Sequence, residues 1–479
     1  MNTKSIVPFA AAAMATLFVP SALAASDADL KVIREQIQEL KAIYEKRISD
    51  LERRLQQAEA AAGKAEAAAG RAEAGANSAQ ATAQSAAIQA NSRPASENAF
   101  NPALSLILNG VYTNLSRDPA NYQLSGFVPT LGEVSPGARG LSLGESELAV
   151  SANIDHTLRG NLFASITPEN TIGVEEAYVQ SIGLSNGFTF KAGRFFSGVG
   201  YLNEVHAHAW DFTDAPLASK VFLGNQFADD GVQLKWVAPT ETYFDVGAEI
   251  GRGRSFPGSN PDKNGAGSST LFAHFGGDIG AGAAWRLGAS LLSTAPRNRA
   301  YEDLDALGAT VTNSFSGTSR LAVVDGVLKW APNGNATEHS FKLQGEYFRR
   351  VEDGTLTYDT AGASLGTLSD RYRSAQSGWY LQSVYQFMPR WRAGYRYDRL
   401  NAGTVSNGLI ASGALAAADF PSLASYNPTR NTLMLDFSPS EFSRFRLQFA
   451  QDKSRLGLTD NQIFLQYIVS LGAHGAHKF

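Results

Sequence analysis

From about residue 98 onward, apolar and polar residues alternate along short segments that are rich in aromatic side chains. Residues 188–192 (FTFKA), 285–289 (WRLGA), 391–397 (WRAGYRY) and 445–449 (FRLQF) are typical. One face of each segment is aromatic or aliphatic, and the other carries Lys, Arg, Gln, Thr or Gly. A period of two residues indicates β-strands whose two faces meet different surroundings.

The segments predict about sixteen antiparallel strands, with tight turns such as residues 155–157, 238–240, 332–334 and 438–440 alternating with much longer loops. This alternation is typical of a transmembrane β-barrel, whose apolar face meets lipid and whose charged face lines a wet lumen. In a soluble β-sandwich there is no physical reason for tight turns and long loops to alternate. We therefore expect an all-β transmembrane barrel over residues 104–479. Its strands are predicted at 104–114, 142–155, 158–167, 173–182, 187–195, 229–236, 241–250, 268–276, 283–293, 319–330, 338–350, 376–387, 390–400, 428–438, 442–451 and 461–471.

A different pattern occupies residues 27–90, which are almost free of aromatic residues and rich in Ala, Glu, Gln, Lys and Arg. The apolar positions from Leu30 to Tyr44 are spaced three and four residues apart, and the spacing resumes after one stutter. This heptad seam predicts an N-terminal α-helical coiled coil, which implies self-association, most simply as a trimer or dimer. Residues 25–91 would form a stalk whose alanine-rich half could be a loose helix, and residues 92–103 a linker.

Both ends of the chain carry export signals. Lys4, the apolar residues 6–20 and the small residues 22–24 form a signal peptide over residues 1–24. The alternative is a membrane anchor, but Pro8 and Pro20 interrupt the apolar run. A terminal strand that ends on Phe479 resembles the signal by which the barrel-assembly machinery of Gram-negative bacteria recognises outer-membrane barrels. We therefore expect the cell outer membrane, with the stalk in the periplasm.

Composition excludes several other classes. The chain has no cysteine, so disulfides and thiolate metal sites are excluded. A net charge of -4 argues against a nucleic-acid partner. The sequence contains no GxSxG nucleophile elbow, and no serine stands out as the partner of a histidine base. We therefore do not expect an enzyme.

The inward positions of the predicted strands carry opposite charges on early and late strands. An acidic wall that faces a basic wall would create a transverse field, which favours polar or zwitterionic solutes over apolar ones. The sign of ion selectivity stays open. The predicted pore-lining residues are Glu145, Glu147, Asp245, Glu249, Arg392, Arg396, Arg430, Arg444 and Arg446.

Several stretches resemble known outer-membrane families. The architecture looks like that of trimeric sixteen-stranded porins with a periplasmic coiled coil. Residues 174–179 (VEEAYV) and 190–195 (FKAGRF) are similar to paired strands of phosphate-selective porins. Residues 98–110, 140–155, 193–212, 229–236 and 466–479 resemble a proteobacterial family often labelled TonB-dependent or zinc-regulated outer-membrane receptors. TonB-dependent receptors have about 22 strands and an N-terminal plug domain, for which the segments before this barrel leave no room.

Residues 201–217 (YLNEVHAHAWDFTDAPL) concentrate two of the seven histidines beside several carboxylates. Porin resemblance places this segment in the third long outer loop, which narrows the channel. His206, His208, Asp211 and Asp214, with Glu204 nearby, could hold a loosely bound zinc ion. The alternative is hydrogen bonding within a folded loop that Trp210 and Phe212 pack against the wall. His474 and His477 could form a second site.

These patterns predict a porin for passive, partly selective diffusion of small polar or charged solutes, possible divalent metal ions among them. Lipid and a homotrimer are the expected partners. Two alternatives stay open. One is a TonB-dependent or zinc-related receptor. The other is an envelope tether, in which the barrel anchors a stalk that contacts peptidoglycan.

Overall fold

The computed structural model describes residues 102–130 and 134–472, together with scattered positions between 35 and 57. The chain divides into two compact units, Met1–Ala99 and Phe100–Phe479. The predicted signal peptide, the alanine-rich half of the stalk, almost all of the linker, His474, His477 and Phe479 lie outside the described residues.

The described positions of the first unit are all α-helical and exposed, as predicted for the stalk. Lys41 and Glu45 form an ion pair one turn apart, with 3.9 Å between Nζ and Oε1. The seam residues lie outside the described positions, so the coiled coil stays a prediction. Within the described residues, no helix is long and apolar enough to cross a membrane.

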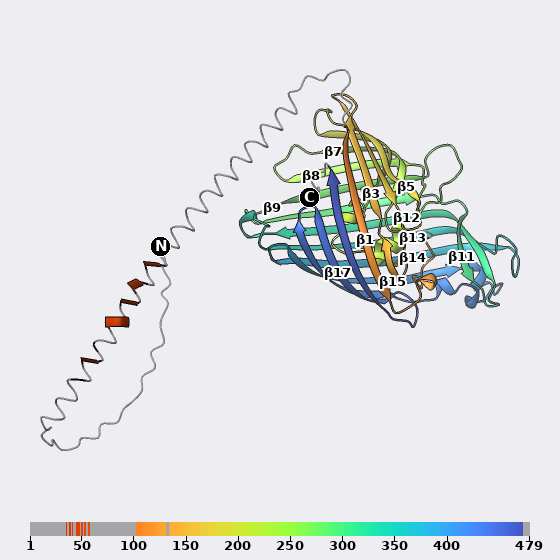
Figure 1. Cartoon of the computed structure of the whole chain (residues 1–479). Helices are drawn as coiled ribbons and strands as arrows, with labels where there is room; N and C mark the ends of the chain where they lie inside the picture. Colours follow the sequence, from red (N-terminus) through yellow and green to blue (C-terminus); the bar gives the residue numbers. More distant parts are fainter. Residues whose placement is uncertain are drawn as a thin grey trace, which may run out of the picture. The chain divides into compact units, whose positions relative to one another are not determined.

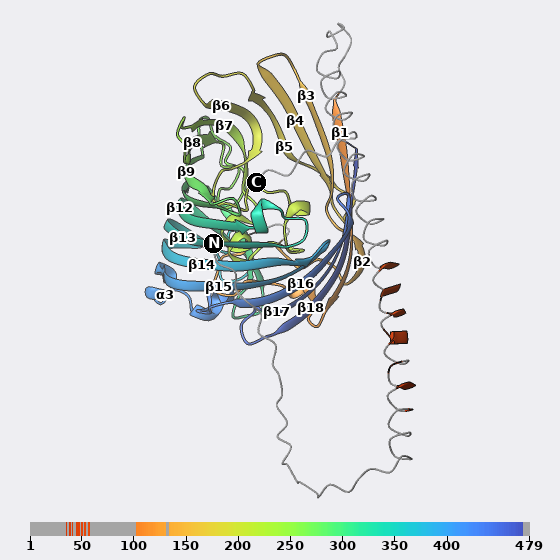
Figure 2. The same cartoon turned by 90° about the vertical axis from the view of Figure 1, so that its left-hand side faces the viewer.

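The second unit is an eighteen-stranded antiparallel sheet that closes on itself, because β18 pairs with β1 (Figures 1 and 2). Sixteen strands make the wall, since β2 and β3 are two halves of one strand and β11 pairs only with β12. The wall strands are β1 (Ala103–Leu115), β2 (Gly140–Leu143) with β3 (Ser146–Asn153), β4 (Leu158–Ile166), β5 (Ile172–Ser181), β6 (Phe188–Phe196), β7 (Ala228–Val237), β8 (Tyr243–Gly251), β9 (Ser268–Ile279), β10 (Ala283–Thr294), β12 (Thr310–Trp330), β13 (Ser340–Tyr358), β14 (Leu368–Met388), β15 (Trp391–Asn407), β16 (Thr429–Ser440), β17 (Ser443–Lys453) and β18 (Asp460–Gly472).

Every predicted strand is present, and three features differ from the prediction. Strands β12 to β15 continue well beyond their expected ends, and β11 (Arg299–Leu304) pairs with the extension of β12. Two short helices, α2 (Leu217–Leu223) and α3 (Gly408–Ala411), interrupt long loops. The predicted strand over 142–155 is broken at residues 144–145, where the pairing with β1 shifts by one residue.

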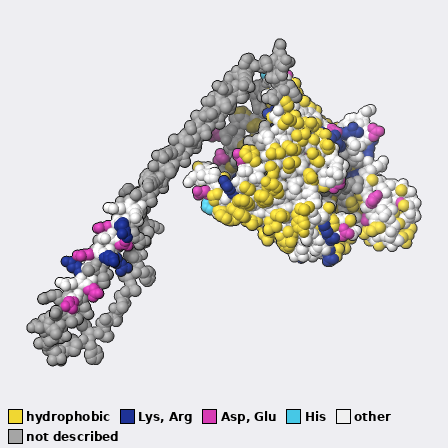
Figure 3. Space-filling view, in the orientation of Figure 1, with side chains coloured by type: hydrophobic (Ala, Val, Ile, Leu, Met, Phe, Trp, Pro, Cys, Tyr) yellow, Lys and Arg dark blue, Asp and Glu magenta, His cyan; other side chains and the backbone are white. Residues whose placement is uncertain are grey.

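The two faces of the wall have opposite chemistry. Large aliphatic and aromatic side chains are exposed on the outer face, and on the side of the barrel seen in Figure 3 apolar side chains predominate. The inner face carries buried polar and charged side chains on alternate positions, among them Gln344, Arg350, Asp436 and Gln462. An apolar exterior on a closed wall in which every strand pairs with its neighbours is the arrangement that a bilayer requires.

Side chains of the long loops pack against the inner wall of the barrel. A buried apolar cluster joins Phe127 of the first loop and Val221 and Phe222 of α2 to inward side chains of the wall, such as Phe348 and Tyr380. Phe222 stacks on Phe348 with 5.9 Å between ring centroids. We call the loop ends of the strands the long-loop end and the opposite rim the short-turn end.

Candidate channel constriction

Residues 197–227, here called loop 3, connect β6 to β7 and lie inside the barrel, as predicted. Its first residues are fixed to the inner wall by two buried glutamates. The N–H of Gly198 donates to Oε1 of Glu249 over 2.9 Å, and the N–H of Tyr201 donates to Oε1 of Glu346 over 2.5 Å. Gly200 has a φ of +74°, and a Cβ there would lie 2.3 Å from Oε1 of Glu346, so this turn requires glycine.

The histidines of loop 3 meet a group of glutamates on β3 and β5, here called the acidic sector. Nδ1 of His206 lies 2.8 Å from Oε2 of Glu147 and 3.3 Å from Oε2 of Glu175. Its Nε2 lies 3.0 Å from Oε2 of Glu176. His208 also approaches Glu147, with 3.4 Å between Nδ1 and Oε2. Burial alone would lower the pKa of His206, but hydrogen bonds to the three carboxylates raise it well above its usual value.

Two irregularities in the wall build the acidic sector. The shift between β2 and β3 brings both Ser146 and Glu147 to the buried side, although neighbours in a regular strand face opposite ways. A bulge in β5 leaves Glu175 unpaired between Glu176, which pairs with Phe163, and Val174. Glu175 and Glu176 therefore both reach His206. Bulges commonly redirect side chains at functional sites.

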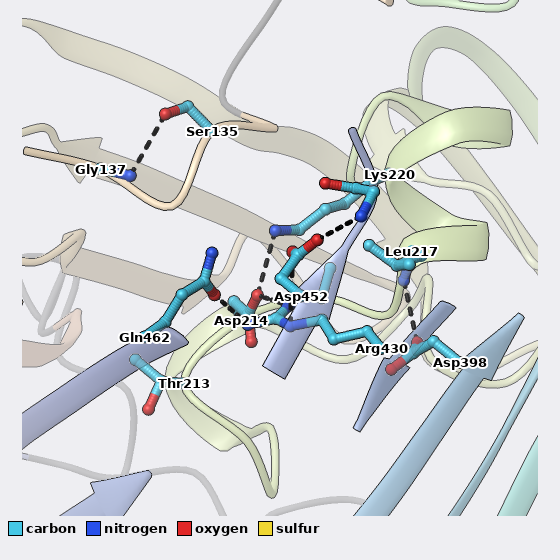
Figure 4. Close-up of polar contacts among 12 residues, drawn as sticks. Ser135, Gly137, Thr213, Asp214, Leu217, Lys220, Asp398, Arg430, Asp452 and Gln462 are labelled. Carbon is cyan, nitrogen blue, oxygen red and sulfur yellow. Dashed lines mark hydrogen bonds and ion pairs between the residues drawn. The ribbon is translucent and has the colours of Figure 1, made fainter. Parts of the chain in front are cut away.

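The aspartates of loop 3 meet cations on β13, β15 and β16, here called the basic sector. Oδ2 of Asp211 accepts from Nζ of Lys342 over 2.9 Å, and Arg392 reaches its other oxygen over 3.3 Å. Asp214 accepts from Arg430, from Nη2 of Arg396 over 3.1 Å and from Nζ of Lys220 in α2 over 3.0 Å (Figure 4).

The structure therefore divides the predicted zinc ligands between two sectors of the wall. Oxygens of Asp211 and Asp214 are engaged by Lys and Arg side chains, whereas His206 and His208 lie with glutamates. The predicted ligand set is wrong in this respect, because a loop that crosses a lumen sends neighbouring residues to different walls. The alternative prediction was a folded loop that Trp210 and Phe212 pack against the wall. The packing is supported, since both side chains are buried.

The predicted pore-lining residues lie on the inner face. Glu147, Asp245, Glu249, Arg396, Arg430 and Arg446 are buried, and Arg392 and Arg444 are partly buried. Glu145 lies next to Glu175. The prediction missed Glu175, Glu176 and Lys342. The consecutive glutamates in VEEAYV were a usable signal, because two charged neighbours in an otherwise alternating strand indicate a bulge.

Asp214 should keep loop 3 in place down to low pH. Burial alone would raise its pKa, but Arg430, Lys220 and Arg396 hold it well below the usual 3.8. A carboxylate with a lowered pKa stabilises the folded loop fully above about pH 3.8, and this contribution is lost as the pH falls through the lowered value. Pepsin at pH 4 should therefore spare the bond at Phe222, and mass spectrometry should find that cut in Asp214→Ala. Cutting of the wild type at pH 4 would contradict the assignment.

The chain is similar to known proteins in structure and, separately, in sequence, although no family model matches it. Similar solved structures include OmpT, an outer membrane protein of Vibrio cholerae in a trimer form, at 10% identity and a TM-score of 0.47 over 78% of this chain and 99% of that one. The outer membrane channel DcaP of Acinetobacter baumannii is 12% identical, with a TM-score of 0.46 over 77% of this chain and 97% of that one. The anion-selective porin from Comamonas acidovorans is 11% identical, with a TM-score of 0.46 over 78% of this chain and 99% of that one. These values are too low to transfer a function or an oligomeric state.

One relative is much closer in sequence. An uncharacterized protein of Aquifex aeolicus (strain VF5) is 31% identical over an alignment of 414 residues that covers 81% of this chain and 81% of that one. Identity at this level over most of both chains indicates common descent and a common fold. The chain belongs to the same family as this Aquifex aeolicus protein.

Proposed function

We propose that the protein is an outer-membrane porin through which small polar or charged solutes diffuse passively. The observation that carries this proposal is loop 3. It lies inside a closed barrel with an apolar outer face and a charged inner face, and it is held there by charge pairs to two sectors of the wall. Such a segment narrows the lumen. It does not close the lumen as a separate plug domain would.

The accessible interior supports selectivity for polar solutes. Glu204, in loop 3, is exposed between the buried Asn203 and the partly buried Val205. Lys235, Arg286 and Lys342 are partly exposed on the inner face. Solutes that pass here would meet both signs of charge, which favours polar and zwitterionic molecules over apolar ones.

Planar-bilayer recordings test the proposal. The purified protein should conduct without an energy source, in steps of three if it is a trimer. A silent barrel that still associates with peptidoglycan would favour the tether, and uptake that depends on TonB would favour the receptor. Sixteen wall strands argue against that receptor class, whose barrels have about 22. A homotrimer, a periplasmic stalk and delivery by the barrel-assembly machinery belong to the same proposal.

A second candidate function is the loose binding of a divalent cation in the acidic sector. Ligand atoms of Glu147, Glu175 and His206 lie within 4.8 Å of one another, and carboxylates with an imidazole suit zinc. The ion would lie between Nδ1 of His206 and the carboxylates of Glu147 and Glu175, which now contact one another directly. His208 lies at the edge of the same group.

Micromolar zinc should therefore reduce the current of the wild type. Glu175→Gln and His206→Gln should each abolish the effect, since the first replaces a carboxylate by an uncharged, weakly ligating amide and the second removes the imidazole. Asp211→Asn should retain it, because Asp211 lies with Lys342 and Arg392. His156→Gln, in an exposed turn, is the matched control. Zinc insensitivity of the wild type would eliminate the site, and loss of the effect in Asp211→Asn would restore the ligand set expected from the sequence.

A further inference from the structure

The outer surface of β12 to β15 and β17 carries a group of exposed cations towards the long-loop end, here called the basic face. Each cation stands between two buried or inward neighbours along its strand, which places it on the outside of the wall. Arg320 lies diagonally across from Arg349 on the neighbouring strand, since its partner Val351 is two residues further along. The basic face consists of Arg320, Arg349, Arg371, Arg373, Arg399 and Lys453.

The positive charges of the basic face exceed the negative ones around them. Asp353 pairs with Arg373 over 3.0 Å and with Arg371 over 3.3 Å. Within the described part of the chain, the other four cations of the face form no ion pair with a carboxylate. Each arginine offers five N–H donors in a rigid fork, and neighbouring like charges on a sheet repel one another. An anionic group between these side chains would satisfy the donors and remove the repulsion.

The depth of the basic face follows from aromatic residues on the same strands. Each strand of the face carries one outward ring at the short-turn end, and Arg320, Arg349 and Arg399 lie eight to ten residues from the ring of their own strand. At about 3.4 Å per residue and a tilt of about 40°, this separation spans about 21–26 Å of the membrane normal. The apolar band of such barrels is about 25 Å tall, so the three arginines lie at its outer border. The rings are those of Trp330, Phe341, Tyr385, Trp391 and Phe445.

A second row of aromatic residues places the same border independently. Tyr347 and Trp379 lie opposite each other on the outer face, exposed at 44% and 37%. Trp379 contacts Tyr397 with 5.4 Å between ring centroids, and its cross-strand partner on β15 is Arg399. Tyrosine and tryptophan collect at the level of the lipid headgroups, because one end of the side chain is apolar and the other is polar. Arg349 follows Tyr347 by two residues, so it reaches the headgroups themselves.

We propose that the basic face binds a phosphorylated glycolipid of the outer leaflet, whose phosphates pair with its arginines. The long loops of such barrels face outwards, so the headgroups that meet this border belong to the outer leaflet. Arginine pairs with phosphate through two parallel hydrogen bonds. The four strands from β12 to β15 span about 14 Å, which suits a headgroup with more than one phosphate better than a single phosphodiester. The inference requires a barrel in the outer membrane, and it does not require conduction.

Native mass spectrometry of the delipidated full-length protein in detergent measures the binding. The probe is a diacylated glucosamine disaccharide with two phosphates, and it should bind, whereas the same glycolipid without phosphates should not. Arg320→Gln/Arg349→Gln should weaken binding about thirtyfold, since each cation near a membrane surface contributes about a factor of five. Arg390→Gln is the matched control and should bind like the wild type, because Arg390 is exposed in the turn between β14 and β15 at the short-turn end.

Other outcomes overturn the inference. Equal binding of the glycolipid with and without phosphates would exclude it, as would wild-type affinity in the double variant or an equal loss in Arg390→Gln. Phosphatidylglycerol that binds as tightly would reject the glycolipid. The heat-induced mobility shift of a folded barrel checks folding, and Arg399→Gln, with an expected loss of about fivefold, serves if the double variant fails that check. Conductance is read separately: a silent barrel that binds the glycolipid would reject the porin and retain the inference.

Discussion

Asp214→Ala is expected to release loop 3 from the basic sector and give channels with larger, more variable conductance. The substitution leaves Arg396 and Arg430, exposed at 1% and 0%, without the carboxylate they share. Removing one partner of a buried ion pair costs about 3–5 kcal/mol when the remaining charge is left uncompensated. Here Arg396 still pairs with Asp398 and Arg430 with Asp452, so the cost should be smaller. The strand ladders do not depend on Asp214, so the barrel itself should persist. Single-channel recording of the reconstituted variant measures both the mean step and its scatter.

The matched control is Asp353→Ala, which removes a carboxylate that pairs with Arg371 and Arg373 on the exposed outer surface. Exposed pairs contribute about 0–1 kcal/mol, so this variant should conduct like the wild type. Wild-type conductance in Asp214→Ala, with the protein folded, would show that the charge pairs do not hold the loop.

Phe222→Ala is expected to loosen the same loop from its apolar side. The Phe222 ring is fully buried, contacts Phe127 and Phe348 at 5.9 Å between centroids, and lies beneath the guanidinium of Arg350. Truncating such a ring costs about 3–5 kcal/mol through lost burial and the cavity left behind. Loop 3 should become sensitive to protease in intact membranes, while the barrel retains its heat-induced mobility shift.

Phe442→Ala provides the comparison, because Phe442 is exposed in the turn before β17. It should leave the digestion pattern of loop 3 unchanged. A loop 3 that resists protease in Phe222→Ala as well as in the wild type would mean that the apolar cluster is not what fixes it.

The wall could be predicted because its signal is repeated along the chain. A strand with lipid on one side and a polar interior on the other must alternate, so β17 or β18 is recognisable from a few residues. The extensions of β12 to β15 and the hairpin with β11 were missed, since beyond the bilayer nothing imposes that alternation. The seven residues of α2 are all buried, so they show no amphipathic pattern to detect.

The site could be predicted only in part, for a physical reason. The motif YLNEVHAHAWDFTDAPL indicated a loop that lies inside the barrel, as the structure has it, and its role as a constriction stays a prediction. Proximity in sequence suggested one ligand set for His206 and Asp214. In the fold, His206 contacts glutamates of the acidic sector, and Asp214 contacts arginines of the basic sector. Glu175 and Glu176 could not both be assigned to the interior from alternation, because a bulge breaks that rule.

If solutes pass beside loop 3, a bulky group attached to its exposed part must hinder them, and a single thiol provides the point of attachment. The chain has no cysteine, so Glu204→Cys carries one reactive group, at an exposed position of the loop. A bulky, membrane-impermeant thiol reagent added during single-channel recording should lower the current in discrete steps, and Phe442→Cys should show none. An unchanged current after full modification of Glu204→Cys, verified by mass spectrometry, would show that solutes do not pass beside loop 3.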